Sequence, residues 1–548
     1  WYLKDFQSFI DYNIQDVEIV DRLEDKMRLI ELCLTMAYDA KVNYMDVLGS
    51  VKYWDILIYN ELRKKNIVIP QKIQREKSDK FEGAYVKDPI VGLHKWVMSF
   101  DLNSLYPHLI MQYNISPETL VADKAVKNMS VEKMLNKEVD TSILKDATMT
   151  PNGALFKTTQ KGFLPELMQK MYDDRVKFKQ LMIEAQKDYE KTKDPKLQKT
   201  IAKFNNIQMA KKISLNSAYG AIGNVWFRYY NLLVAEAITT SGQLAIRYIE
   251  HSLNKYLNKI LNTRGEDYII ASDTDSVYIT FDKLVSKVFV PDTDNNKIVE
   301  FLDTVAKEKI EPFIDKSYQE LAEYVNAYEQ KMQMKREVIA DKGIWVAKKR
   351  YILNAHDVEG VRYKEPKLKI MGVEAVKSST PAACREKIKE ALTIIMNEDD
   401  KVLNSFIQDF RTEFMNLKPE LIAYPRSVNG LTKWTESHNL FKKGAPIHCK
   451  GAILYNHLLQ DKKLQGKYPY IQEGDKIKFL HMKTPNVYQS TSISFMTKLP
   501  KELNLHNIID YDMQFEKSFV EPLKFITNII KWQIDDSYGT QGTLEGFF

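Results

Sequence analysis

Residues 268–281 form two short apolar runs, Tyr268-Ile-Ile-Ala-Ser272 and Ser276-Val-Tyr-Ile-Thr-Phe281, which flank the polar triplet Asp273-Thr274-Asp275. Runs rich in β-branched and aromatic residues on either side of a polar turn predict a β-hairpin. Two carboxylates one residue apart at the end of buried strands repel each other unless a cation is present. Mg²⁺ prefers hard oxygen ligands and few protein contacts, so the turn is a candidate metal site. The ordinary alternative is a solvated turn, in which Asp and Ser are common.

A second buried run ends at another carboxylate. Lys95-Trp-Val-Met-Ser-Phe100 predicts a strand that leads into Asp101, after which the chain turns through Leu102-Asn-Ser-Leu105. The backbone N–H groups of residues 102–105 can form an anion-binding turn. Tyr106 precedes Pro107, which favours an extended backbone at the tyrosine. The ordinary alternative is an aromatic ring packed beneath the end of the strand.

A third polar pattern lies in a helical region. Helix formers dominate residues 162–220, which predicts two long helices joined near Asp194-Pro195. On the second helix, helical spacing places four residues on one face, namely Lys212, Asn216, Tyr219 and Gly220. The lysine can bind phosphate, the phenol can stack on a base, and the glycine leaves room beside it. Arg175 and Lys179 form an i,i+4 cationic pair that points the same way if the hairpin folds back.

Composition describes a folded protein without a membrane span. Of the 548 residues 44% are hydrophobic and 28% charged, the net charge is +6, and no apolar run approaches the roughly 18 residues of a membrane helix. Three widely spaced cysteines fit a reducing compartment and exclude a disulfide framework or a four-cysteine zinc site. Residues 170–212 hold twelve basic and six acidic residues, and residues 331–350 hold seven and two. Each run alone is typical of a solvated face, but two of them around a carboxylate-rich centre suggest a polyanion beside a metal.

Other segments have simpler patterns. We expect one or two helices in residues 5–40, loop and turn in 66–92, helix in 227–261 and 298–335, and strands with turns in 344–372.

The three polar patterns together resemble the motifs of the family B DNA polymerases, in the same order along the chain. Asp101–Pro107 resembles motif A, Lys212–Gly220 motif B and Asp273–Ser276 motif C. The resemblance covers essentially all 548 residues and is greatest to the replicative polymerases of T-even-type bacteriophages. Further similar runs are Gly223–Tyr230, Lys348–Tyr351, Tyr363–Gly372 and Lys377–Pro381.

The resemblance implies an α+β, right-hand polymerase fold. Its palm would be an antiparallel β-sheet flanked by helices, its fingers a helical hairpin and its thumb mixed. The implied segments are an exonuclease-domain remnant (1–30), a linker or N-terminal-domain segment (31–72), palm (73–161), fingers (162–224), palm (225–372), thumb (373–540) and a clamp-binding peptide (541–548).

The implied activity is template-directed addition of deoxynucleotides to a primer 3′-hydroxyl with two Mg²⁺ ions. Asp101 and Asp275 would be the bridging ligands, with the Leu102 carbonyl as a further oxygen and Asp273 in support. Lys212 would give a proton or charge to the departing pyrophosphate. The remaining nucleotide contacts would be Ser104 and Leu105 through their N–H groups, Arg175, Lys179, Asn216, Tyr219 and Gly220.

The resemblance also assigns a selectivity residue and DNA contacts. Tyr106 would be the steric gate whose ring excludes a ribose 2′-hydroxyl. Primer–template DNA would be held without sequence choice. The residues implied for this contact are Gly83, Tyr85, Lys348, Lys349, Arg350 and Tyr351.

Both ends of the chain suggest partners. Tyr12 and Asp16 resemble the third exonuclease motif, but the other carboxylates of a 3′→5′ exonuclease do not occur in this sequence. We expect a separate N-terminal chain to supply them for proofreading; the alternative is an N-terminal part that was removed or is unresolved. Gln541, Leu544, Phe547 and Phe548 resemble a sliding-clamp-binding peptide; a frayed tail is the alternative. We expect no membrane partner and, for a phage-encoded protein, the host cytoplasm.

Competing interpretations remain open at this point. A catalytically inactive, polymerase-like scaffold of a replisome is one, although Asp101, Asp275, Lys212 and Tyr106 are all present. An RNA-dependent or reverse-transcribing polymerase usually carries adjacent aspartates, which Thr274 separates here. An aspartic protease is excluded because Asp275 stands where its Asp-Thr-Gly loop has glycine.

Overall fold

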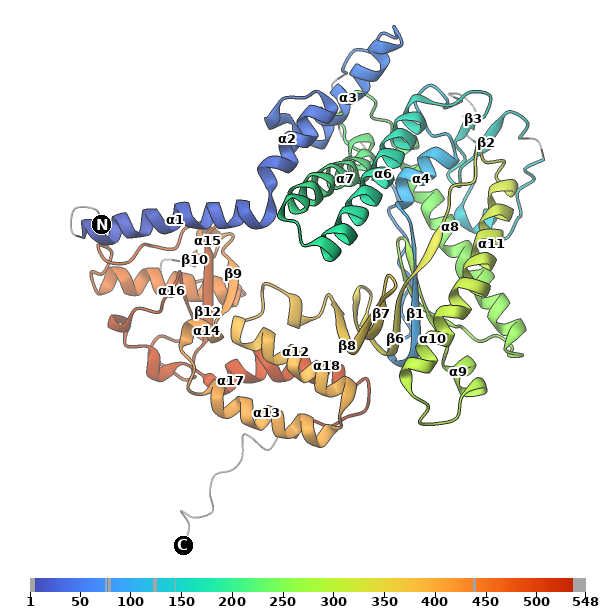
Figure 1. Cartoon of the computed structure of the whole chain (residues 1–548). Coiled ribbons are helices and arrows are strands. Elements are labelled where there is room, and N and C mark those ends of the chain that lie inside the picture. The colour runs from blue at the N-terminus through green and yellow to red at the C-terminus, as the bar shows by residue number, and fades with distance from the viewer. Residues whose placement is uncertain are drawn as a thin grey trace. The chain divides into compact units, whose positions relative to one another are not determined.

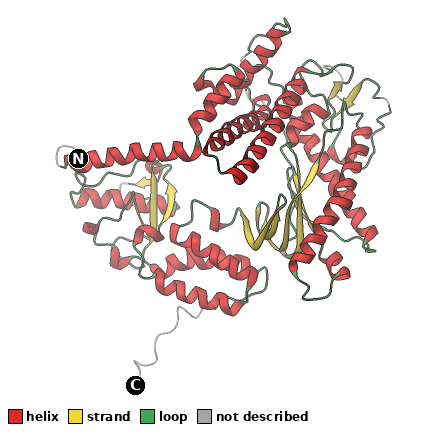
Figure 2. Ribbon diagram, in the orientation of Figure 1, coloured by secondary structure: helices red, strands yellow, loops and turns green. Residues whose placement is uncertain are grey.

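A computed structural model describes residues 5–73, 76, 80–121, 126–142, 144–436 and 440–535. Helices and strands are both abundant (Figures 1 and 2). The chain divides into two compact units. Unit 1 comprises residues 1–86, 100–277 and 303–336, and unit 2 comprises residues 87–99, 278–302 and 337–548.

Unit 1 is mainly helical. Its helices are α1 (Phe6–Met27), α2 (Leu29–Ala40), η1 (Tyr44–Leu48), α3 (Ser50–Lys64), α4 (Leu105–Gln112), α5 (Val131–Leu135), α6 (Phe163–Thr192), α7 (Pro195–Ile222), α8 (Leu232–Ile260), the π-helical turn η2 (Ala306–Ile310) and α11 (Glu311–Tyr324). Its strands are β2 (Ala147–Met149), β3 (Leu155–Lys157) and β4 (Ile269–Asp273). Four further elements carry residues of both units, namely β1 (Gly92–Leu102), β5 (Ser276–Thr280), α10 (Asn295–Val305) and β6 (Met334–Ala347).

Unit 2 mixes short strands and helices around its own apolar core. Its strands are β7 (Arg350–Val358), β8 (Val361–Met371), β9 (Tyr424–Ser427), β10 (Thr435–Glu436), β11 (Leu440–Phe441), β12 (Lys476–His481) and β13 (Ser492–Phe495). Its helices are α9 (Asp282–Val288), η3 (Glu374–Val376), α12 (Ala382–Asn397), α13 (Asp400–Phe414), α14 (Pro419–Ile422), α15 (Leu431–Trp434), α16 (Ile447–Asp461), η4 (Lys501–Leu503), η5 (His506–Ile508), α17 (Tyr511–Phe515), η6 (Glu516–Val520) and α18 (Glu521–Thr527).

A six-stranded sheet carries the predicted hairpin. Its strand order is β4-β5-β1-β6-β7-β8. β6, β7 and β8 pair antiparallel, with Ile344 opposite Ile352 and Leu353 opposite Lys369. The predicted hairpin is confirmed, because β4 and β5 are adjacent and flank Thr274. The sheet order also makes β1, which delivers Asp101, the neighbour of β5.

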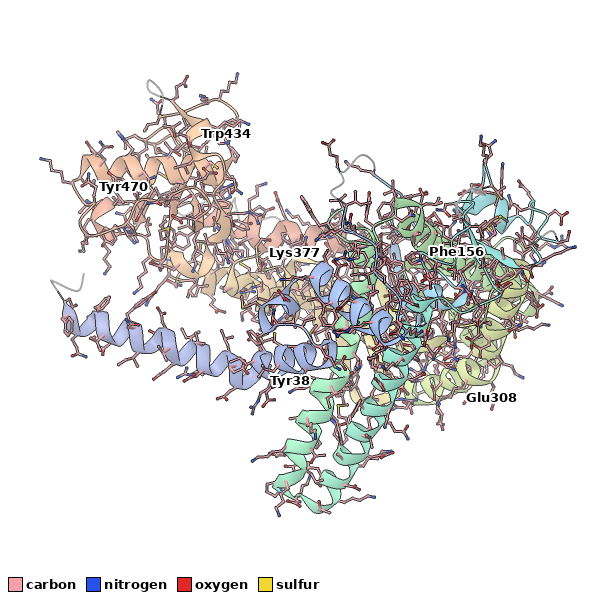
Figure 3. All side chains as sticks on the ribbon, turned by 90° about the horizontal axis from the view of Figure 1, so that it is seen from above. Tyr38, Phe156, Glu308, Lys377, Trp434 and Tyr470 are labelled. Carbon is pink, nitrogen blue, oxygen red and sulfur yellow. The ribbon has the colours of Figure 1, made fainter. Side chains whose placement is uncertain are left out.

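The helical hairpin predicted in residues 162–220 is confirmed as α6 and α7, which lie side by side in both views of the molecule (Figures 1 and 3). Lys193 ends α6 in the left-handed conformation, with φ of 54°. Asp194 then accepts a hydrogen bond from the Lys196 N–H, and Pro195 occupies the first turn of α7. A side-chain cap followed by proline is the usual start of a helix, so the local sequence fixes the turn.

Most of the simpler predictions are confirmed. Residues 5–40 form α1 and α2, separated at Arg28, whose φ is 51°. The predicted helix 227–261 begins only at Leu232, after the cap Asn231. The helix predicted in 298–335 ends at Tyr324, and residues from Met334 belong to β6, so its last third is wrong. In the part of the chain that the structure describes, no helix is long and apolar enough to cross a membrane.

Candidate active site

The Asp273–Ser276 turn is fixed by backbone contacts on both sides. Thr274 adopts φ of 58°, and its N–H donates to the Tyr85 carbonyl oxygen at 3.0 Å. The Asp275 N–H donates to the Asp273 carbonyl oxygen at 2.6 Å, and Thr274 Oγ1 donates to the Asp273 carboxylate at 3.1 Å. All three residues are half-buried. The turn therefore holds both carboxylates at the end of a rigid hairpin.

The segment after β1 turns sharply into α4. Ser104 is the N-cap with φ of 48°, and α4 begins at Leu105. The expectation that Pro107 keeps Tyr106 extended is wrong, because both residues lie in the first turn of α4. Proline is tolerated there because the first N–H groups of a helix have no intrahelical acceptor.

Of the four N–H groups predicted to bind an anion, those of residues 102–105, only two are available in the part of the chain that the structure describes. The Leu102 N–H donates to the Asp275 carbonyl oxygen at 2.8 Å, and the Asn103 N–H donates to the Gln333 carbonyl oxygen at 3.0 Å. Those two groups are already engaged. Among the described residues, no acceptor is found for the N–H groups of Ser104 and Leu105, which stand at the N-terminus of α4. A helix N-terminus with available donors favours an anion such as phosphate.

Asp101 and Asp275 stand at the neighbouring ends of adjacent strands, joined by the Leu102–Asp275 hydrogen bond. Two carboxylates and nearby backbone carbonyls are a hard-oxygen donor set that suits Mg²⁺, which keeps several of its ligands from water or substrate. Within the described residues, no group of three or more His, Cys, Asp and Glu side chains is arranged to hold a metal. Asp101 and Asp275 are therefore at most part of a coordination shell, the rest of which would come from backbone carbonyls, water or substrate.

The α7 face predicted from spacing lies beside motif A. The Tyr219 and Tyr106 rings are 4.7 Å apart between centroids, and Phe81 contacts Tyr219 edge-on at 6.4 Å. Lys212 and Asn216 are exposed on the same helix, and Gly220 has open space where a side chain would stand. The ring pair thus joins motif B to motif A, while the cation and amide remain available to a ligand.

The α6 cations also reach motif A. Arg175 donates from Nη1 to Ser104 Oγ at 3.1 Å. Arg175 and Lys179 line one pocket of about 340 Å³ together with Asn103 and Tyr172. Asn103 donates to the Tyr172 hydroxyl, a contact that the sequence patterns did not indicate. The pocket places two cations next to the turn whose N–H groups are available.

Tyr106 stands on a surface built by α8. A Cβ added at Gly242 would lie 3.4 Å from Tyr106 Cε1, so the glycine lets the ring lie against the helix. Burial, with the neighbouring Tyr219 and Asp275, raises the pKa of Tyr106 to about 12. The phenol is therefore neutral at physiological pH.

Gly83 and Tyr85 lie in an irregular segment that contacts α8. The Gly83 carbonyl oxygen accepts from Gln243 Nε2 at 2.7 Å, and Arg247 lies over the Tyr85 ring at 5.2 Å. Since the Tyr85 carbonyl also accepts from Thr274, this segment supports the motif C turn.

The Lys348–Tyr351 run, in unit 2, contains two exposed lysines and two less exposed residues. Lys348 and Lys349 are exposed at the β6–β7 turn, where Lys348 Nζ lies 3.0 Å from Asp88 Oδ1. Arg350 donates from Nη2 to both carboxylate oxygens of Glu374 at 3.0 and 2.8 Å. Tyr351 is 7% exposed, stacks on Trp345 at 5.4 Å and shares a 2.7 Å hydrogen bond with the Tyr278 hydroxyl. The two lysines are thus the members of this run that a ligand can reach.

Two of the predictions concern the ends of the chain. Tyr12 and Asp16 are exposed on α1, none of whose residues is buried. Gln541, Leu544, Phe547 and Phe548 lie outside the described residues.

Comparison with known proteins assigns the family. The family model described as "DNA polymerase family B" matches residues 50–530. The chain belongs to DNA polymerase family B. This family B chain is 36% identical to the DNA-directed DNA polymerase of Escherichia phage RB69 over 96% of its length, and 34% identical to that of Enterobacteria phage T4 over 94%. It is 28% identical to DNA polymerase 1 of Pyrococcus abyssi over 65%. The chain spans 63% of the length of either phage relative.

Proposed function

We propose that this chain is a template-directed DNA polymerase of the right-hand type, which adds deoxynucleotides to a primer 3′-hydroxyl. The observation that carries the proposal is a set of contacts linking the three motifs within unit 1. The Leu102–Asp275 hydrogen bond joins motif A to motif C, the Tyr106–Tyr219 ring contact joins motif A to motif B, and Arg175 bonds Ser104. These contacts support a single site made of carboxylates, phosphate-binding donors and a base-stacking ring.

Different residues would bind the metal ions, bind the phosphates and assist the leaving group in nucleotidyl transfer. Asp101 and Asp275, with the Leu102 carbonyl and support from Asp273, would hold two Mg²⁺ ions. When bound, such a pair lowers the pKa of the attacking hydroxyl and neutralises charge on the phosphates. Arg175 forks two phosphate oxygens, which a lysine such as Lys179 cannot do. Lys212 provides a proton or positive charge as pyrophosphate leaves.

The remaining site residues bind and select substrate. The Ser104 and Leu105 N–H groups and Asn216 would hold the triphosphate, and Tyr219 and Gly220 would line the nascent base pair. Tyr106 would pack against the sugar. The exposed lysines of the β6–β7 turn, Lys348 and Lys349, would hold the DNA backbone without sequence choice, which makes binding salt-dependent.

The partners follow from the termini. A sliding clamp would bind the peptide from Gln541 to Phe548. Trimming of a primer would depend on further carboxylates, such as those of a separate N-terminal chain, because a two-metal exonuclease uses several and Asp16 is the residue among 1–548 that resembles one.

The test is primer extension by the purified chain with Mg²⁺ and a labelled primer–template. We expect extension with deoxynucleotides and no 3′→5′ trimming without them. Asp275→Ala should lower the rate by about 10³-fold or more, because charge stabilisation at the reacting phosphate is lost. Asp292→Ala, which removes an exposed carboxylate from a turn, is the control and should be unchanged. Equal activity of the Asp275→Ala and unaltered chains would contradict the proposal, and DNA binding without extension would favour the scaffold.

A further inference from the structure

The rear of α7 carries a second row of polar side chains. Lys211, Ser214 and Ser217 recur every three residues, about half a turn around the helix from Lys212, Asn216 and Tyr219. We call the side of α7 that carries Lys211, Ser214 and Ser217 the rear face. The opposite side, which carries Lys212, Asn216 and Tyr219, is the front face. Lys211 and Ser214 are buried, and Ser217 is half-buried.

Each rear-face residue bonds the segment formed by α2 and α3. Lys211 Nζ lies 2.7 Å from Asp39 Oδ1 at the end of α2. Ser214 Oγ donates to the Tyr53 hydroxyl at 2.7 Å, and Trp54 Nε1 donates to Ser217 Oγ at 3.0 Å. Tyr53 and Trp54, both on α3, are each only 1% exposed, so these two bonds are largely shielded from water.

Lys211 also bonds the other helix of the hairpin. Its Nζ lies 3.1 Å from Asp174 Oδ2 on α6, directly before Arg175. The Lys211 side chain is 8% exposed, whereas Asp39 and Asp174 are 29% and 38% exposed. One buried cation therefore connects α2, α6 and α7. A buried charge with two carboxylate partners is weak evidence for stability, but it can fix the relative position of the helices that it joins.

These bonds fix the direction of the front face. Rotation of α7 about its axis, or a shift along it, would break the Lys211, Ser214 and Ser217 bonds together. The same movement would turn Lys212 and Tyr219 away from motif A. On the α6 side, the bond to Asp174 holds the residue next to Arg175. The rear face is thus placed to set the geometry of the phosphate-binding groups on both helices.

We infer that Lys211, Ser214 and Ser217 are positioning residues, through which α2 and α3 hold α7 in the orientation that binds the incoming nucleotide. The inference rests on the proposed polymerase function. It gives residues 29–64 a role in nucleotide affinity. The side chains of this segment that bond α7 contact its rear face, opposite the face that would bind the nucleotide.

The test compares nucleotide kinetics of the full chain and its variants at fixed primer–template concentration. Lys211→Met should raise KM for the deoxynucleotide about fivefold or more, because small displacements of substrate-positioning groups have large effects. The rate at saturating nucleotide and the affinity for primer–template without nucleotide should change less than about twofold. Lys199→Met, which removes an exposed cation from the same helix, is the matched control.

Two further variants keep the test valid if Lys211→Met does not fold. Ser214→Ala with Ser217→Ala removes two hydrogen bonds and no charge, and should raise KM in the same direction. Lys211→Met leaves the Asp39 carboxylate without its cation. Adding Asp39→Asn removes that negative charge and should restore part of the lost melting temperature. KM for the nucleotide should remain raised. An unchanged KM in the folded variants would overturn the inference alone. No incorporation by the unaltered chain would overturn the proposed function as well.

Discussion

At the scale of single residues, Tyr106 is held on two sides. Gly242 of α8 lies behind its ring and Tyr219 lies beside it. The ring, rather than the hydroxyl, is what a sugar would meet. Tyr106→Ala should therefore raise the use of ribonucleotides relative to deoxynucleotides by about tenfold or more, because a steric obstacle is removed. Tyr106→Phe keeps the ring and should retain the discrimination.

The measurement is the ratio of kcat/KM for the two sugar types in single-nucleotide extension. Because the pKa of Tyr106 is raised to about 12, its phenol does not ionise between pH 7 and pH 9. The ratio for the unaltered chain and for Tyr106→Phe should accordingly show the same pH dependence. Unchanged discrimination in Tyr106→Ala would remove the steric-gate assignment.

The sequence predicts the polar residues of the site better than their surroundings. Spacing alone placed Lys212, Asn216 and Tyr219 on one face of a helix, since helical periodicity is a local property. The Lys211–Asp39 pair was missed because its members are 172 residues apart. In the sequence Lys211 is one charge in a basic run. It differs from Lys212 in being buried, which a count of charges does not reveal. Tyr106 was misjudged because the rule for residues before proline is a preference that a helix start overrides.

At the scale of elements, features marked by neighbouring residues are predicted from the sequence, and features that depend on distant residues are not. The α6–α7 hairpin and the β4–β5 hairpin were predicted because caps, turns and periodicity mark them locally. The helix predicted in residues 298–335 is too long because its last residues join a sheet whose strand order is not encoded nearby. The two-unit division likewise depends on segments that are distant in sequence.

The β6–β7 turn illustrates an element whose shape depends on a glycine. Gly372, just beyond β8, has φ of 64°, and a Cβ there would lie 2.2 Å from the Lys349 carbonyl oxygen. Gly360, between β7 and β8, has φ of 83° but open space around it. Gly360→Ala should therefore cost about 1 kcal/mol for the left-handed backbone alone. Gly372→Ala carries that cost together with a clash that displaces the turn.

We expect Gly372→Ala to lower the melting temperature more than Gly360→Ala, as measured by circular dichroism. Because Lys348 and Lys349 flank the displaced backbone, Gly372→Ala should also weaken primer–template binding and make it less sensitive to salt. The slope of log affinity against log salt should fall by about one for each DNA phosphate that the turn no longer neutralises. Titrations at several salt concentrations check this. Equal binding by the two variants would show that the turn does not hold DNA.

At the scale of the whole molecule, buried phenols set the response to alkaline pH. Burial raises the pKa of Tyr53 and of Tyr455 to about 12, and both side chains are at most 2% exposed. In the unfolded chain the same groups ionise near pH 10. The folded state therefore binds more protons between these values. The stability that the neutral phenols allow is complete below about pH 10 and is lost as pH rises toward 12.

The free energy of unfolding should accordingly fall above pH 10, by up to about 1.4 kcal/mol per pH unit for each such phenol. Phenolate absorbance and circular dichroism, followed together in one titration, separate the two populations among the 30 tyrosines. Exposed phenols such as Tyr38, which is 83% exposed and labelled in Figure 3, should ionise near pH 10 while the chain remains folded. The buried set should ionise only as the circular dichroism signal is lost. Tyr455→Phe should move the loss of structure to higher pH. A single absorbance transition near pH 10 with the fold intact would contradict this account, since it would mean that water reaches Tyr53 and Tyr455 in the native state.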